Sequence, residues 1–122
     1  MKKYILILGL AILAISCSRN LVKTKTGLVG KWKLTESLID PGDGSGKWTA
    51  PTENTVIEFT SDGLIKYNTG ESDNYKIIND SLFQTSSSSS STINYTYKVE
   101  GNKLFMRPPC IEACGERYVR LK

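Results

Sequence analysis

The clearest alternation of apolar and polar positions in this chain lies between residues 93 and 100. Apolar or aromatic side chains occupy every second position and polar side chains lie between them: Ile93, Tyr95, Tyr97 and Val99 against Asn94, Thr96, Lys98 and Glu100. Successive side chains of a strand point to opposite faces, so this pattern predicts an antiparallel strand with one face buried and the other in water.

Short apolar segments separated by turn residues follow one another from residue 28 onward. The other segments that we expect to form strands are residues 28–39, 55–60, 64–68, 75–78, 81–85, 103–107 and 116–121. Asn79-Asp80 and Gly101-Asn102 are typical of hairpin turns, and the serine run from Ser86 to Ser91 predicts a flexible loop. No window shows a convincing amphipathic helix. Seven or eight strands at this spacing predict an all-β fold, either a sandwich or a meander barrel.

The first predicted strand carries a carboxylate on its apolar face. Trp32, Leu34 and Leu38 share one face at a period of two, and Glu36 lies between them. If that face points inward, so does Glu36. A buried, unpaired carboxylate is costly, so we expect Glu36 to pair with an arginine or to line a wet mouth.

Three aromatic residues are candidates for a ligand site together with Glu36. Phe59, Tyr95 and Tyr97 offer either an apolar lining with polar tips or a filled core, and the sequence leaves both alternatives open. Trp48 lies in a glycine-rich segment, where we expect a loop that carries it as a lid or as a cap on the core.

Residues 1–16 have the composition of a bacterial export signal. Lys2 and Lys3 precede an apolar run that ends at Ile15, and this run is shorter than the roughly 20 residues of a membrane span. The segment Leu13-Ala14-Ile15-Ser16-Cys17 resembles a lipobox, which implies cleavage before Cys17 and lipidation of Cys17. An ordinary secretory signal is the alternative.

This signal sets the expected organisation and location of the protein. We expect a signal peptide at residues 1–16, a lipidated tether at residues 17–27 and one domain at residues 28–122. In lipoproteins of the Bacteroidetes, which the chain resembles, an acidic patch after the cysteine directs export to the cell surface. Ser18-Arg19-Asn20 contains no acid, so we expect attachment to a membrane of the bacterial envelope, facing the periplasm.

Two cysteines remain once Cys17 is assigned to lipid. Cys110 and Cys114 lie close together in the sequence, and an oxidising envelope favours a disulfide between them. Free thiols, zinc ligation and a redox pair are the alternatives. Zinc would need further ligands, and the chain has no histidine.

Charge and residue types argue against several classes of function. The formal net charge is +4, and two of the lysines belong to the signal, so we expect no nucleic-acid partner. Without histidine the commonest general base is missing, and no spacing of carboxylates indicates an acid/base pair. Asp40, Asp43 and Asp62 are typical of turns and lack the order of a calcium loop. We therefore expect a monomer without a metal, a cofactor or enzymatic activity.

The segment from Leu28 to Leu34 contains Gly30-Lys31-Trp32 and resembles the opening strand of lipocalin-like domains in lipoproteins of the Bacteroidetes type. The succession of short strands and the closing Cys-x-x-x-Cys segment extend the resemblance over residues 28–122. It implies a small antiparallel meander barrel of about eight strands, wide enough for one small apolar ligand.

The same resemblance implies structural roles for three residues. Gly30 would let the chain bend at the floor of the barrel, and Trp32 would plug the closed end. A basic residue of the last strand would cover Trp32, with Arg120 as the first candidate and Arg117 as the second.

Two hypotheses about function follow. The first is a lipid-anchored barrel that binds a small apolar molecule. The second is a filled barrel that presents its surface to another protein of the envelope, as inhibitor lipoproteins do. A cavity lined by Phe59, Tyr95 and Tyr97 would favour the first hypothesis.

Overall fold

The computed structural model describes residues 27–122, so the predicted signal peptide, Cys17 and nearly all of the tether lie outside the described residues. The strands are β1 (Gly30–Ile39), β2 (Lys47–Thr49), β3 (Val56–Phe59), β4 (Leu64–Tyr67), β5 (Ser72–Asn79), β6 (Leu82–Ser86), β7 (Thr92–Glu100), β8 (Lys103–Arg107) and β9 (Cys114–Arg120). Within residues 27–122 no helix is long and apolar enough to span a membrane.

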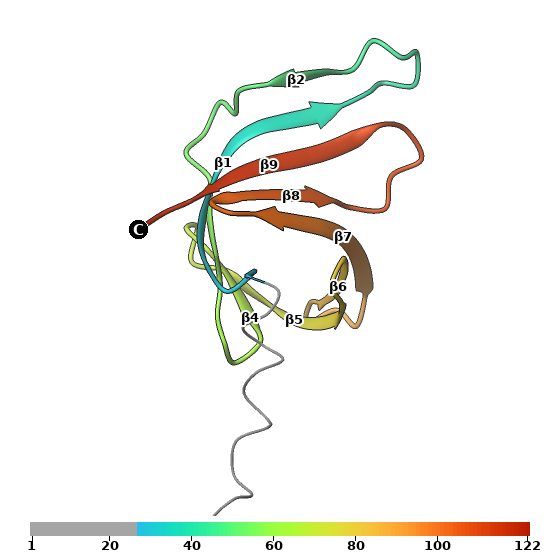
Figure 1. The fold of residues 1–122 in the computed structure, drawn as a ribbon. Coiled ribbons are helices and arrows are strands. Elements are labelled where there is room, and N and C mark those ends of the chain that lie inside the picture. The colour runs from blue at the N-terminus through green and yellow to red at the C-terminus, as the bar shows by residue number, and fades with distance from the viewer. Residues whose placement is uncertain (1–26) are drawn as a thin grey trace, which may run out of the picture.

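The strands form one antiparallel meander that closes on itself. The order in the sheet is β2-β1-β3-β4-β5-β6-β7-β8-β9, and β9 also pairs with β1. Eight strands therefore close a barrel, and β2 is an additional strand at its side, as Figure 1 shows. This confirms the predicted all-β meander barrel of about eight strands and excludes the sandwich.

Strand β1 is shared between two neighbours along one edge. Its first half pairs with β3 from Gly30 to Lys33, and its end pairs with β2 from Ser37 to Ile39. Trp48 lies in β2 opposite Leu38, so the prediction that it lies in a loop as a lid or cap is wrong. The pairing extends over only three residues of each strand, which is too short for a recognisable alternation in the sequence.

A β-bulge in β1 changes which side chains face the barrel interior. The register with β9 shifts between Leu34 and Glu36, so Leu34 lies opposite the buried Tyr118 but Glu36 lies opposite Arg117. The extra residue at the bulge reverses the inward and outward positions of the residues that follow it, because successive side chains of a strand point to opposite faces. Glu36 therefore lies on the outer face, and the expectation that it points inward is wrong.

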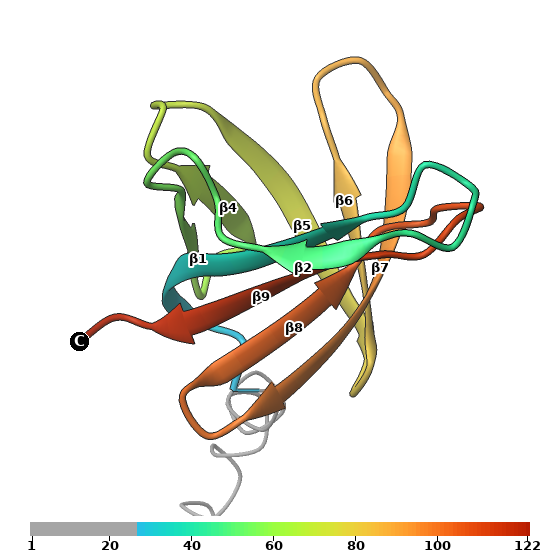
Figure 2. The ribbon, with the colours of Figure 1, turned by 90° about the horizontal axis from the view of Figure 1, so that it is seen from above.

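The connections between the strands lie at two opposite ends of the barrel. The closed end contains Trp32 and the turns β3–β4, β5–β6 and β7–β8. The loop end, opposite to it, contains the connections β1–β2, β4–β5, β6–β7 and β8–β9. Figures 1 and 2 show the loop of residues 40–46 beside the cysteine loop at this end.

Aromatic side chains fill much of the interior. Phe59 and Phe83 are fully buried, and their rings meet edge to face with centroids 5.4 Å apart. Tyr75 and Tyr97 pack against the same cluster, and their hydroxyl groups donate to the backbone oxygens of Thr60 at 2.6 Å and Asn79 at 3.2 Å. Such aromatic pairs add about 0.5–1.5 kcal/mol beyond their buried area.

Candidate functional site

The closed end is built around the indole of Trp32. This side chain is fully buried, and its Nε1–H donates to the backbone oxygen of Leu28 at 2.8 Å. The Arg120 guanidinium carbon lies 4.1 Å from the centre of the indole. Arg120 also donates to the backbone oxygens of Val29, at 3.0 Å, and Gly27. Arg120 thus links the backbone that precedes β1 to the closed end of the barrel.

Gly30 makes this arrangement sterically feasible. Its φ is +140°, and a β-carbon at this position would lie 2.5 Å from Nη1 of Arg120. Any other residue would collide with the guanidinium or force it to move. Gly30, Trp32 and Arg120 therefore form one structural unit, while Arg117 covers a different indole, that of Trp48.

The residues predicted to line a ligand site occupy different environments. Phe59 and Tyr97 lie within the packed core. Tyr95 is partly buried and stacks on Phe83, with ring centroids 5.1 Å apart and planes 2° from parallel. Glu36 lies outside the barrel and accepts an ion-paired hydrogen bond of 2.9 Å from Arg117. Only Tyr95 among these four combines an inward position with partial exposure near the loop end.

Polar side chains line the interior near the loop end. We call them the polar band: Tyr67, Asp73, Thr85, Tyr95, Glu116 and Tyr118. The Tyr67 hydroxyl donates to Oδ2 of Asp73 at 3.0 Å, and the Tyr118 hydroxyl donates to Oε2 of Glu116 at 2.8 Å. Of these residues, only Tyr95 was predicted from the sequence to line a ligand site.

The carboxylates of the polar band influence its tyrosines. Burial raises the pKa of Tyr67 above the ordinary value, and the hydrogen bond to Asp73 raises it further. Burial likewise raises the pKa of Tyr118, and so does the neighbouring Glu116. The pKa of Tyr95 is raised by burial and then by the charges of Glu116 and Asp73. Both carboxylates therefore act on the same interior region from β5 and β9.

Thr85 is a buried member of the polar band. It is 7% exposed and alternates with the buried Phe83 along β6, so its side chain faces the interior. Cross-strand pairing places it opposite Tyr75 on β5 and opposite Ile93 on β7, one diagonal step from Asp73 and from Tyr95. Within the described residues, its hydroxyl group has no hydrogen-bond partner.

A second candidate site lies on the outer face of the barrel, where aromatic rings cover β9. We call this group the outer cluster: Leu38, Trp48, Phe105, Gly115 and Arg117. The Arg117 guanidinium carbon lies 3.8 Å from the centre of the Trp48 ring, and the Trp48 and Phe105 centroids are 6.1 Å apart. The small Gly115 leaves room for both rings.

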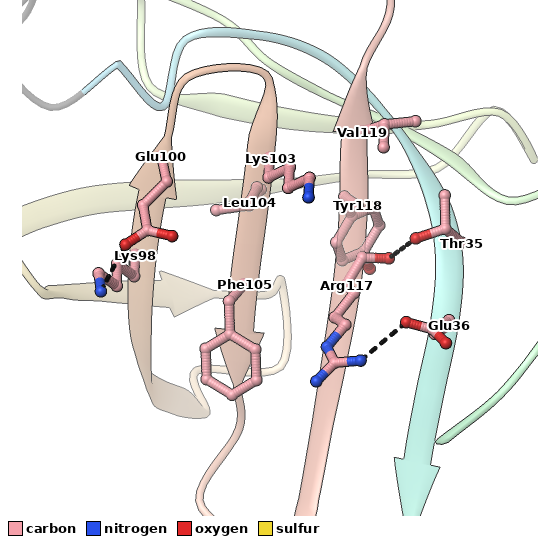
Figure 3. A pocket seen from close by; sticks show the side chains of 10 residues that line it. All are labelled: Thr35, Glu36, Lys98, Glu100, Lys103, Leu104, Phe105, Arg117, Tyr118 and Val119. Carbon is pink, nitrogen blue, oxygen red and sulfur yellow. Dashed lines mark hydrogen bonds and ion pairs between the residues drawn. The ribbon is translucent and has the colours of Figure 1, made fainter.

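A shallow groove of about 290 Å³ runs beside the outer cluster. Figure 3 shows the Phe105 ring and two ion pairs on its walls. Lys98 and Glu100 pair at 2.6 Å, and Arg117 pairs with Glu36 at 2.9 Å. These pairs are exposed, so each contributes little to stability.

The cysteine loop contains the predicted covalent link. Cys110 and Cys114 form a disulfide, which confirms the prediction from the sequence. The bond closes the loop between β8 and β9 at the loop end.

The aspartate-rich loop after β1 is held by its own backbone. The Asp40 carboxylate accepts hydrogen bonds from the backbone N–H groups of Gly42 at 2.8 Å, Gly44 at 3.1 Å and Gly46 at 2.9 Å. The bonds from Gly42 and Gly46 lower the pKa of Asp40 most. Among residues 27–122, no group of three or more cysteine, aspartate or glutamate side chains is arranged to hold a metal ion.

Comparison with known proteins identifies the domain. The family model described as a lipocalin-like domain matches residues 28–118, well over half of the chain. No curated protein matches the sequence significantly.

Proposed function

The chain belongs to the lipocalin-like domain family, and we propose that it is a lipid-anchored protein of the bacterial envelope whose barrel binds a small molecule with an apolar body. Lipocalin-like domains are generally non-catalytic, which favours a binding role over an enzymatic one. Family membership and the eight-stranded closed barrel together support this proposal, because a barrel of this size can hold one small ligand.

The observation that carries the proposal is the composition of the loop end. The fully buried Phe59 and Phe83 fill the interior beneath it, whereas Tyr67 and Tyr95 are only partly buried. Apolar rings with a few convergent polar groups are the usual lining of a small-molecule site. The ligand would therefore contact Tyr95 near the loop end, above the core that includes Phe59 and Tyr97.

Titration with a neutral apolar fluorophore tests this role. We expect N-phenyl-1-naphthylamine to bind the purified protein, and we expect Tyr95→Ala to weaken binding by more than about fivefold, as loss of a stacking surface would do. Tyr75→Phe is the matched control, because it changes a tyrosine deeper in the barrel without removing a ring. Absence of saturable binding to the unmutated protein would contradict the small-molecule role.

Lipid anchoring is a separate part of the proposal and is supported by the sequence of residues 1–17. Two or more acyl chains anchor a protein far more firmly than the single chain that binds only marginally. We expect Cys17→Ser to abolish labelling by a palmitate analogue and to release the protein from membranes. Cys110→Ser, which leaves the signal intact, is the control, and unchanged membrane association of Cys17→Ser would contradict the anchor.

The groove on the outer face favours a second candidate function, an interaction module with a filled barrel. Its walls combine the exposed part of the outer cluster with paired charges, which suits a protein partner better than an apolar small molecule. Crosslinking from a photoreactive residue at position 103, beside the groove, would test it. A discrete crosslinked partner that Phe105→Ala abolishes would support this function, and its absence would count against it.

A further inference from the structure

The interior of the barrel is acidic near the loop end and basic only at the closed end. Among the described strands that close the barrel, Arg120 is the only inward-facing basic residue. Its guanidinium is already engaged by Trp32 and by two backbone oxygens. Asp73 and Glu116 therefore share the interior with neutral hydrogen-bond donors, the hydroxyl groups of Tyr67 and Tyr118.

This distribution of charge favours a cationic group in the same space. Asp73 and Glu116 are partly buried, and a partly buried carboxylate is stabilised by a nearby cation more than by a neutral donor. Each carboxylate has a second oxygen besides the one bound by its tyrosine, and each oxygen can accept more than one hydrogen bond. Asp73 on β5 and Glu116 on β9 both face the interior near the loop end, and each accepts a hydrogen bond from a tyrosine hydroxyl.

The burial of Thr85 is an independent observation that favours a polar ligand group near the loop end. Its side chain is more than nine-tenths buried, faces the interior, and has no hydrogen-bond partner within the described residues. A buried hydroxyl without a partner costs free energy, so such groups usually bind a ligand or a water molecule. In the strand register, Thr85 lies one diagonal step from both Asp73 and Tyr95. Its hydroxyl oxygen can accept a hydrogen bond from an ammonium group.

The aromatic side chains near the loop end can pack against the apolar part of such a ligand. Tyr95 and Phe83 stack in parallel, and Tyr95 is only partly buried. A tyrosine face attracts a cation within about 6 Å of its centroid and also packs against a flat apolar body. The groups near the loop end thus offer an anionic surface for a head group and an aromatic surface for a ring.

We propose that the loop end of the barrel binds a small organic amine, whose ammonium group is recognised by Asp73, Glu116 and Thr85 and whose apolar body packs against Tyr95. This proposal rests on the proposed small-molecule function and specifies the chemical class of the ligand. It adds a charged group to the small apolar ligand that the sequence suggested.

Three indole compounds of similar size but different charge test the proposal. Calorimetric titration of the purified protein would compare tryptamine, which is cationic, with the neutral tryptophol and the anionic indole-3-acetate. We expect tryptamine to bind at least about tenfold more tightly than tryptophol, as a charge-assisted hydrogen bond provides, and indole-3-acetate to bind most weakly.

Matched variants test whether the preference for tryptamine over tryptophol arises from these loop-end residues. Asp73→Asn and Glu116→Gln keep an acceptor for the neighbouring tyrosine hydroxyl but remove the charge, so each should reduce the preference for tryptamine by at least about threefold while tryptophol binding stays the same. Thr85→Val preserves the shape of the side chain and should also weaken tryptamine binding. Glu100→Gln on the outer face is the control and should leave all three affinities unchanged.

The outcomes separate this proposal from the proposed function. Equal affinities for tryptamine and tryptophol, or binding of N-phenyl-1-naphthylamine without binding of any indole, would overturn recognition of an amine and leave the small-molecule role standing. A preference for tryptamine that persists in both carboxylate variants would also overturn it. Failure of all four compounds to bind would overturn both proposals.

Discussion

Replacement of Trp32 by alanine tests the architecture of the closed end. Truncation of a fully buried tryptophan costs about 3–5 kcal/mol of unfolding free energy through lost burial and the cavity left behind. Two further losses follow from the structure. The Leu28 carbonyl loses its indole donor, and Arg120 loses an aromatic face that contributes about 0.5–2 kcal/mol. We therefore expect a total loss of about 4–7 kcal/mol, a large part of the stability of a domain of this size.

Urea denaturation followed by circular dichroism measures this loss. Because Trp32→Ala could fail to fold, Trp32→Phe provides a milder test. It retains most of the ring but lacks the N–H donor, and we expect it to cost about 1–2 kcal/mol. Trp48→Ala is the matched control, since this partly buried tryptophan also lies under an arginine but on the outer face. A Trp32→Ala loss no larger than that of Trp48→Ala would refute the role of Trp32 as the plug.

Three other predictions concern the cysteine loop, the outer cluster and the buried tyrosines. Peptide mapping of the unreduced protein should find Cys110 linked to Cys114, and rapid alkylation of both thiols without denaturant would contradict this. A β-carbon at Gly115 would lie 3.0 Å from the Trp48 ring, so Gly115→Val should cost about 1–3 kcal/mol by overpacking, measured by urea denaturation. Because the pKa of Tyr118 is raised in the folded protein, the native state holds this proton more tightly than the unfolded state, and stability should fall as the pH rises above the ordinary tyrosine value of about 10. Urea midpoints across this pH range should fall less steeply for Tyr118→Phe, and identical slopes would contradict the effect.

The fold was predictable wherever alternation continued over several residues. The pattern from Ile93 to Val99 corresponds to β7, and the turn at Gly101-Asn102 joins β7 to β8 as expected. The turn predicted at Asn79-Asp80 lies one residue later, at Asp80-Ser81, because Asn79 still pairs with Leu82. Strand β2 was not predictable, because its three residues gain their structure from pairing with the end of β1. Tertiary contact, rather than local propensity, determines such a short strand.

The candidate site was less predictable because it combines single residues from several strands. Asp73 shares the inward face of β5 with Tyr75 and Ile77, and this period of two was a usable signal in the sequence. Thr85 ends a predicted strand, but nothing local in the sequence distinguished it as a candidate site residue. Its significance comes from burial without a hydrogen-bond partner, which depends on how β5, β6 and β7 pair.

The β-bulge in β1 shows how one residue changes the interpretation of a whole site. Extrapolation of the period of two from Trp32 placed Glu36 inside the barrel, where it would have added a third carboxylate to the interior. The bulge instead pairs Glu36 with Arg117 outside, and it leaves Ser37 opposite Glu116. Bulges are common at the rims of barrels, where they redirect side chains. Here the bulge separates two surfaces, because it puts the Glu36–Arg117 pair beside the outer groove and leaves the interior carboxylates to Asp73 and Glu116.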